Sequence, residues 1–152
     1  MALRIYPDTS VFGGCLDADF AEWSNRLMED FSAGVRIAVV SDLTLKEIQA
    51  APVSVRSVLD RIPDQHREYV SLDDEAKDLA RLYIKHDAVA EKQLVDAQHI
   101  AIATVHSVSV LVSWNFRHIV NLTRIRLYNS VNLKYGYPLL EIRSPREVVR
   151  EG

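Results

Sequence analysis

The sequence predicts an α/β protein in which helices cover both faces of a mainly parallel β-sheet. Short runs of branched aliphatic residues alternate with longer amphipathic stretches along the chain, which is the pattern of strands connected by helices. Several of these runs lack polar alternation, as expected for parallel strands buried on both faces. The 152 residues are 48% apolar and 26% charged, which suits one compact domain. We therefore expect residues 1–152 to form a single three-layer α/β/α sandwich.

The N-terminal part is predicted to hold two strands with a helix between them. Residues 3–6 form a β-prone run that stops at Pro7, so Asp8 lies just past the first strand. An apolar spacing of three and four residues predicts an amphipathic helix that ends near Gly34; its apolar members are Leu16, Phe20, Trp23, Leu27 and Phe31. Residues 36–40 are predicted to be a second, buried strand.

The middle of the chain is predicted to be mostly helical. The expected elements are a helix that Ser41 or Asp42 caps and Pro52 ends, a helix over 53–62, a short strand over 69–72 and a helix from 73 towards Lys85. That last helix begins with Asp73, Asp74 and Glu75, the charge that a helix N-terminus favours.

The C-terminal third contains an apolar helix over 94–106 that has almost no polar face, so we expect it to be central. A core strand over 108–112 should follow. Beyond it the sequence predicts a loop at Ser113, Trp114 and Asn115, a short helix over 119–127 and a last strand over 138–142.

Charge and cysteine content exclude some classes of protein. The single cysteine, Cys15, rules out an intrachain disulfide and a cysteine-based zinc cluster. No signal peptide and no apolar run of about 18 residues are present, so we expect a cytoplasmic protein without membrane spans. Residues 97–140 lack acidic side chains while Arg117, Arg124, Arg126 and Lys134 supply positive charge. This segment is either a face for a polyanion or a solvated surface.

Polar residues fall near the carboxyl ends of the predicted strands, where ligands bind in such sheets. Asp8 follows the first strand, Glu47 lies on the helix after the second, and Asn115 follows the third. Asp96 begins the apolar helix and shares one of its faces with His99.

If the three acids converge, their repulsion requires a divalent cation, and carboxylate oxygens suit Mg²⁺ or Mn²⁺. Such ions activate water in many nucleases. Each residue also has an ordinary explanation: Asp8 as a helix cap, Glu47 as a solvated acid, Asp96 as a helix-start acid and Asn115 as a turn residue. His99 and His118 are more readily explained by packing or hydrogen bonding than as ligands, and Cys15 as a small buried hydrophobe.

Four motifs in this order resemble those of PIN-domain proteins, in particular the VapC-type toxins, over nearly the whole chain. The motifs are Asp8-Thr9-Ser10, Glu47, the run from Asp96 to Ala103, and the run from Val112 to Ile119. The resemblance implies a PIN-like α/β/α fold and a Mg²⁺- or Mn²⁺-dependent endoribonuclease that acts mostly on single-stranded RNA.

By the same resemblance, Asp8, Glu47 and Asp96 are the metal-site carboxylates and Asn115 takes a fourth catalytic position. Many PIN nucleases have Asp at that position; because an amide brings no negative charge, a second metal should bind more weakly here. Thr9, Ser10, Arg117 and His118 are candidates for substrate binding.

A VapC-like toxin also implies partners, namely a homodimer and a small antitoxin that blocks the acidic pocket. The helix face around Phe20 and Trp23 is either part of the core, the role we favour, or the groove for this antitoxin. Two alternatives stay open. In the first, which Asn115 suggests, the chain is a catalytically weakened PIN-like module for binding or dimerisation. In the second, it is a different α/β enzyme such as a phosphatase or receiver domain. Against a haloacid-dehalogenase-type phosphatase, Ser10 stands where a second Asp would be expected.

Overall fold

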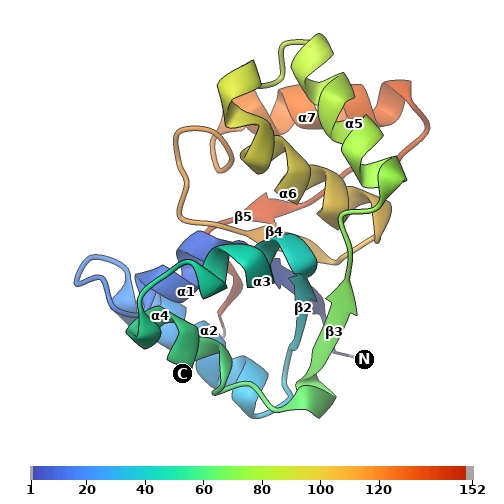
Figure 1. Cartoon of the computed structure of the whole chain (residues 1–152). Helices are drawn as coiled ribbons and strands as arrows, with labels where there is room; N and C mark the ends of the chain where they lie inside the picture. Colours follow the sequence, from blue (N-terminus) through green and yellow to red (C-terminus); the bar gives the residue numbers. More distant parts are fainter. Residues whose placement is uncertain (1, 150–152) are drawn as a thin grey trace.

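A computed structural model describes residues 2–149 and shows a central sheet of five parallel strands (Figure 1). The strand order is β3-β2-β1-β4-β5, and every neighbouring pair is parallel. The strands are β1 (Arg4–Pro7), β2 (Ile37–Ser41), β3 (Arg67–Val70), β4 (Val110–Val112) and β5 (Ile142–Arg143). The predicted α/β class with a parallel sheet is therefore confirmed.

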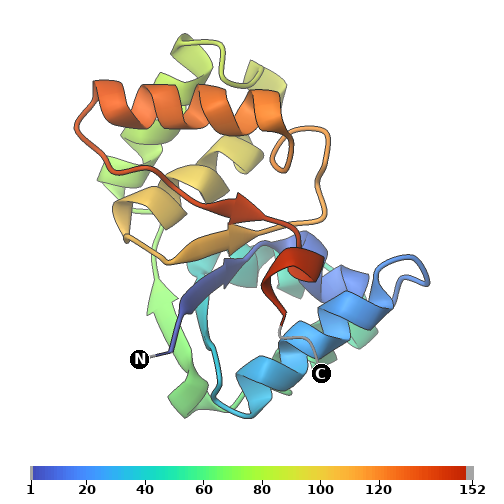
Figure 2. The same ribbon diagram turned by 180° about the vertical axis from the view of Figure 1, so that it is seen from behind.

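Helices cover both faces of this sheet and make the three layers that the sequence predicts (Figures 1 and 2). One face is covered by α5 (Asp74–Lys85), α6 (Leu94–Val105) and α7 (Leu122–Lys134), and the other by α1 (Thr9–Gly14), α2 (Ala21–Ser32), α4 (Val53–Leu59) and α8 (Pro145–Val148). The helix α3 (Asp42–Gln49) follows β2 directly at the carboxyl edge, and the short 3₁₀ turns η1 (Asp64–His66) and η2 (Glu91–Gln93) precede β3 and α6.

Successive strand residues face opposite layers, and this alternation decides where the polar side chains at the strand ends point. On β1, Ile5 packs with the α1, α2 and α4 layer, whereas Tyr6 packs with the α5, α6 and α7 layer. Leu111 on β4 belongs to the same core cluster as Tyr6. Because side chains alternate with a period of two, Asp8 and Ser113 lie on the side of the sheet that α6 covers.

The helix α6 is the centre of its layer, as its apolar sequence predicts. Seven of its residues are buried, among them Ile100 and Ile102, which are fully inaccessible. It lies between β4 and the outer helices α5 and α7. Thr104 near its C-terminal end hydrogen-bonds to Tyr83 of α5 and Asn132 of α7, whereas His99 reaches Glu47 and Tyr6 at the sheet edge.

Several predicted boundaries are wrong, for local reasons. The helix expected from Leu16 starts only at Ala21, because a turn in which Asp17 accepts the Asp19 and Phe20 amides intervenes. Its end is correct: Gly34 has φ +78°, the left-handed conformation that commonly closes a helix.

The C-terminal elements depart furthest from prediction. The helix expected over 119–127 is α7, which starts later and is longer, because the Asn121 side chain caps it by accepting from the Arg124 amide. The strand expected over 138–142 shrinks to the two residues of β5. The sequence analysis missed the helix α8. Its N-terminus is formed by a capping box between Ser144 and Glu147.

No helix among residues 2–149 combines the length and apolar character needed to cross a bilayer.

Candidate active site

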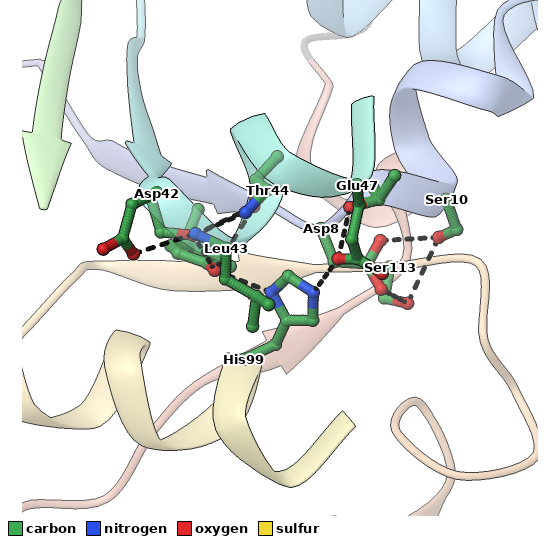
Figure 3. Close-up of polar contacts among 11 residues, drawn as sticks. Asp8, Ser10, Asp42, Leu43, Thr44, Glu47, His99 and Ser113 are labelled. Atoms are coloured by element: carbon green, nitrogen blue, oxygen red, sulfur yellow. Dashed lines mark hydrogen bonds and ion pairs between the residues drawn. The ribbon is translucent and has the colours of Figure 1, made fainter. Parts of the chain in front are cut away.

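Asp8 lies at the carboxyl end of β1, where its amide donates to the Val112 carbonyl of β4 at 3.0 Å. Its side chain is only 5% exposed, and each oxygen accepts one serine hydroxyl: Oδ1 from Ser10 at 2.5 Å and Oδ2 from Ser113 at 2.6 Å (Figure 3). The carboxylate makes no capping hydrogen bond to α1. The helix-cap explanation of Asp8 is therefore wrong, and its place is in the interior of the site.

Glu47 extends from α3 towards the same place (Figure 3). Its Oε1 accepts two hydrogen bonds, from Thr9 Oγ1 at 2.8 Å and from His99 Nε2 at 2.6 Å. The side chain keeps 35% exposure, so it lies at the boundary between the protein interior and solvent. Glu47 is thus held in place and is not a freely solvated surface acid.

His99 is a buried hydrogen-bonding residue, as its ordinary explanation predicts, but the sequence analysis did not identify its partners in the site. Its ring is buried. Its Nε2 is hydrogen-bonded to Glu47, and its Nδ1 is hydrogen-bonded to the Tyr6 hydroxyl at 2.7 Å. The signal was present, since His99 is a polar residue three positions after Asp96 on a helix that is mostly apolar. Spacing alone does not show that α3 brings Glu47 within reach of it.

Asp96 lies half-buried in the first turn of α6, facing the same cluster of charges. Burial raises the pKa of Asp96; the charges of His99 and His118 oppose this, and those of Asp8 and Glu47 add to it. Burial also raises the pKa of Asp8, and the Glu47 charge adds to that shift. The three predicted acids therefore act on one another electrostatically, although they come from three different elements.

The pKa of Glu47 shifts the other way. Partial burial raises it, but the hydrogen bond and charge of His99 and the hydrogen bond of Thr9 together bring the pKa below its ordinary value. At neutral pH Glu47 is therefore ionised, and its negative charge disfavours ionisation of Asp8 and Asp96.

The chemistry of these side chains fits a hard divalent cation, because all three acids offer carboxylate oxygens. A cation would offset the cost of burying Asp8 and Asp96 as anions, which is what their raised pKa values express. Within residues 2–149, however, no three Asp, Glu, His or Cys side chains already form a metal-binding group.

Asn115 has a structural role in the loop after β4. Its Oδ1 accepts the backbone amides of Arg117 at 3.2 Å and His118 at 2.9 Å, and its own amide donates to Ser113 Oγ at 2.9 Å. It therefore acts as the turn residue that the ordinary explanation predicts, and it steadies Ser113 against Asp8.

The other predicted substrate-binding residues divide into two groups. The hydroxyls of Thr9 and Ser10 are occupied with Glu47 and Asp8. Arg117 is exposed and His118 is half-buried, so these two remain accessible to a ligand.

Trp114 connects this loop to the opposite layer, which the sequence did not reveal. Its ring stacks on Phe20 with centroids 4.4 Å apart, and its indole Nε1 donates to Ser24 Oγ at 2.8 Å. Its amide donates to Ser10 Oγ at 3.0 Å, next to the Asp8 bond. Phe20 therefore packs against the site loop and is only partly free for a partner.

Comparison with known proteins gives one informative result. No protein-family model matches the chain, and no curated protein matches it either. Among solved structures, a chain in the crystal structure of VapBC2 from Rickettsia felis bound to a DNA fragment from their promoter superimposes with a TM-score of 0.58 at 12% identity. The match covers 93% of this chain and 98% of that chain. The fold is VapBC2-like. At this identity the likeness concerns the fold alone, and it agrees with the three-layer α/β/α architecture and parallel sheet that the sequence predicts.

The raised pKa values predict an unusual pH dependence of stability. Between the ordinary carboxyl pKa and its own raised pKa, Asp96 is protonated in the folded protein and ionised in the unfolded chain. The stability it contributes is fully present below about pH 4 and is lost as the pH rises through the folded pKa. Without divalent ions, Asp96→Asn should therefore gain stability relative to wild type as the pH rises from about 4 to the raised pKa of Asp96. Melting temperatures measured in chelator test this; a pH-independent difference between the two proteins would refute it.

Proposed function

We propose that this protein is a metal-dependent endoribonuclease of the PIN type that cleaves mostly single-stranded RNA. The observation that carries the proposal is the buried carboxylate of Asp8 at the carboxyl end of the central strand, with Glu47 and Asp96 as electrostatic neighbours. The VapBC2-like fold supports it, since ligands bind outside the carboxyl ends of parallel strands and Asp8 directly follows β1.

Asp8, Asp96 and Glu47 are the residues that would hold Mg²⁺ or Mn²⁺. When bound, such an ion supplies positive charge that acidifies water and offsets the charge developing on a phosphodiester. Ser10 and Ser113 each donate to a different oxygen of Asp8, so they fix the direction of its carboxylate. Asn115 contributes to the same task through Ser113.

The reaction we propose is hydrolysis by water. A water oxygen forms the new bond to phosphorus and releases one proton to solvent. The bond from phosphorus to the 3′ oxygen breaks, and that leaving oxygen takes up a proton from solvent. The products are a 5′-phosphate and a 3′-hydroxyl. Arg117 and Arg126 are exposed and would neutralise backbone phosphates of bound RNA. Arg124 donates to the Ala88 carbonyl, which gives it a structural role instead.

We further propose that the protein is a cytoplasmic toxin that forms a homodimer and is neutralised by a cognate antitoxin. Support comes from the motifs and from the fold of the VapBC2 chain. An antitoxin that inserts a basic side chain among Asp8, Glu47 and Asp96 would offset the same repulsion as a metal ion.

One observation favours a second candidate, a catalytically weakened binding or dimerisation module. The Asn115 amide oxygen is occupied by two backbone amides and carries no charge, so the fourth position adds nothing to the attraction for a cation. Metal binding and RNA cleavage separate the two candidates.

The deciding experiment incubates end-labelled single-stranded RNA with the purified protein in Mg²⁺, in Mn²⁺ and in chelator. We expect cleavage with the ions, none in chelator, and fragments that carry 5′-phosphates and 3′-hydroxyls. Intact RNA under all conditions would favour the binding module, and 2′,3′-cyclic phosphate ends would refute the proposed hydrolysis.

A further inference from the structure

A chain of buried hydrogen bonds runs behind Glu47 and reaches the sheet. The His99 ring is 3% exposed, and the Tyr6 side chain beside it is fully inaccessible. Tyr6 OH lies 2.7 Å from His99 Nδ1 and 2.8 Å from Ser41 Oγ. Ser41 in turn caps α3 by accepting from the Thr44 amide at 3.0 Å. The chain therefore begins at the first turn of the helix that carries Glu47 and returns to Glu47 itself.

The direction of the last hydrogen bond follows from the chemistry of its partners. An ionised carboxylate can only accept, so His99 Nε2 must carry a proton and donate it to Glu47. The imidazole is buried, and Tyr6 fixes it at its other nitrogen. The His99 donor is therefore held in place by its surroundings, and it hydrogen-bonds to the longer and more exposed side chain of Glu47.

Both donors to Glu47 use the same carboxylate oxygen. Thr9 Oγ1 and His99 Nε2 bond to Oε1, at 2.8 and 2.6 Å, and no residue within 2–149 has a hydrogen bond to Oε2 in the structure. One oxygen of Glu47 is thus saturated by protein and the other is left over. A glutamate in solution would exchange its two oxygens freely by rotating about its last bond.

We infer that the buried Tyr6–His99 pair is a positioning device that holds Glu47 by Oε1 and reserves Oε2 as the oxygen offered to a divalent cation. This rests on the proposed function. His99 is a positioning residue here: it acts through Glu47 and contacts neither the cation nor the RNA. Supporting groups of this kind typically change metal affinity by about 10- to 100-fold when removed.

The lowered pKa of Glu47 agrees with this assignment, because the hydrogen bond and charge of His99 are what overcome the effect of burial. A purely structural histidine could instead be replaced by an apolar residue without consequence for Glu47. The two possibilities therefore differ in what happens when the Nε2 donor alone is removed and then restored.

The test compares His99→Leu, which removes the donor, with His99→Gln, whose amide nitrogen can replace Nε2. Calorimetric titration with Mn²⁺ should give a dissociation constant roughly 10- to 100-fold weaker for His99→Leu, and His99→Gln should recover most of the loss. Tyr6→Phe, which removes the hydroxyl that supports the imidazole and also contacts Ser41, should fall between wild type and His99→Leu. His86→Leu, at the C-terminal end of α5, is the matched control and should bind Mn²⁺ like wild type.

A double-mutant cycle with Glu47→Gln shows whether His99 acts through Glu47. We expect His99→Leu to have no further effect on Mn²⁺ affinity in the Glu47→Gln background. Additive effects would overturn the inference, as would wild-type affinity in a folded His99→Leu variant, or no recovery with His99→Gln. Suppose that wild type binds Mn²⁺, that His99→Leu has no effect in the Glu47→Gln background, and that wild type cleaves no RNA. This outcome would overturn the proposed nuclease function and leave the positioning role of His99 standing.

Discussion

Asp8→Asn is expected to abolish metal-dependent RNA cleavage and, at the same time, to make the metal-free protein more stable. Asp8 is the most deeply buried acid of the site, and burial raises its pKa. The neutral amide removes the cost of holding an anion there above that pKa. It also removes one charge that would hold the cation, so the cleavage rate should fall by on the order of 10²- to 10³-fold or more.

Two measurements test this prediction. One is cleavage of labelled RNA in Mn²⁺, and the other is the melting temperature near neutral pH with and without Mn²⁺. The variant should melt higher than wild type in chelator and gain little from Mn²⁺. Asp78→Asn is the matched control, because Asp78 is an exposed aspartate on α5 and should change neither quantity. Full cleavage by Asp8→Asn would remove Asp8 from the mechanism, and a lower melting temperature in chelator would show that its charge stabilises the fold.

Gly14→Ala should destabilise the protein strongly, because the last residue of α1 has no room for a side chain. A Cβ at Gly14 would lie 2.6 Å from both Ser24 Oγ and Trp114 Nε1, the two atoms that bond to each other across the layers. Those atoms belong to packed side chains and not to mobile surface groups. We expect a loss of about 1–3 kcal/mol in the free energy of unfolding, measured by urea denaturation.

The neighbouring Gly13→Ala is a matched control in the same helix. No atom lies within 4 Å of a Cβ at Gly13, and alanine is the better helix former by roughly 0.5–1 kcal/mol. Gly13→Ala should therefore leave stability unchanged or raise it. Equal losses for the two variants would show that the helix backbone, and not the contact with Trp114, decides the effect.

The sequence is sufficient for the architecture because the parallel strands and the buried helix leave unambiguous apolar runs. The strong signals, such as the acidic residues at the start of α5 and the apolar sequence of α6, place those elements correctly. The failures occur where hydrogen bonds of single side chains decide the outcome. The turn around Asp17 divides a continuous apolar spacing, and Asn121 moves the start of α7.

The site is predicted in its acids but not in their supports. Asp8, Glu47 and Asp96 are recognisable because carboxylates near strand ends are chemically conspicuous. Ser113, Tyr6 and His99 are ordinary residues in the linear chain, and their roles depend on how β1, β4 and α6 align in three dimensions. Asn115 shows the converse, since a residue in a catalytic motif position is engaged in closing a turn.

The position of Trp114 gives the protein a built-in optical probe. The chain contains two tryptophans, and the other, Trp23, lies beneath the guanidinium groups of Arg26 and Arg146 on the opposite side of the sheet from α6. With Trp23 replaced by phenylalanine, indole emission arises from Trp114 alone. Its amide shares Ser10 with Asp8, so the wavelength and intensity of that emission follow the environment of the acidic centre without any attached dye.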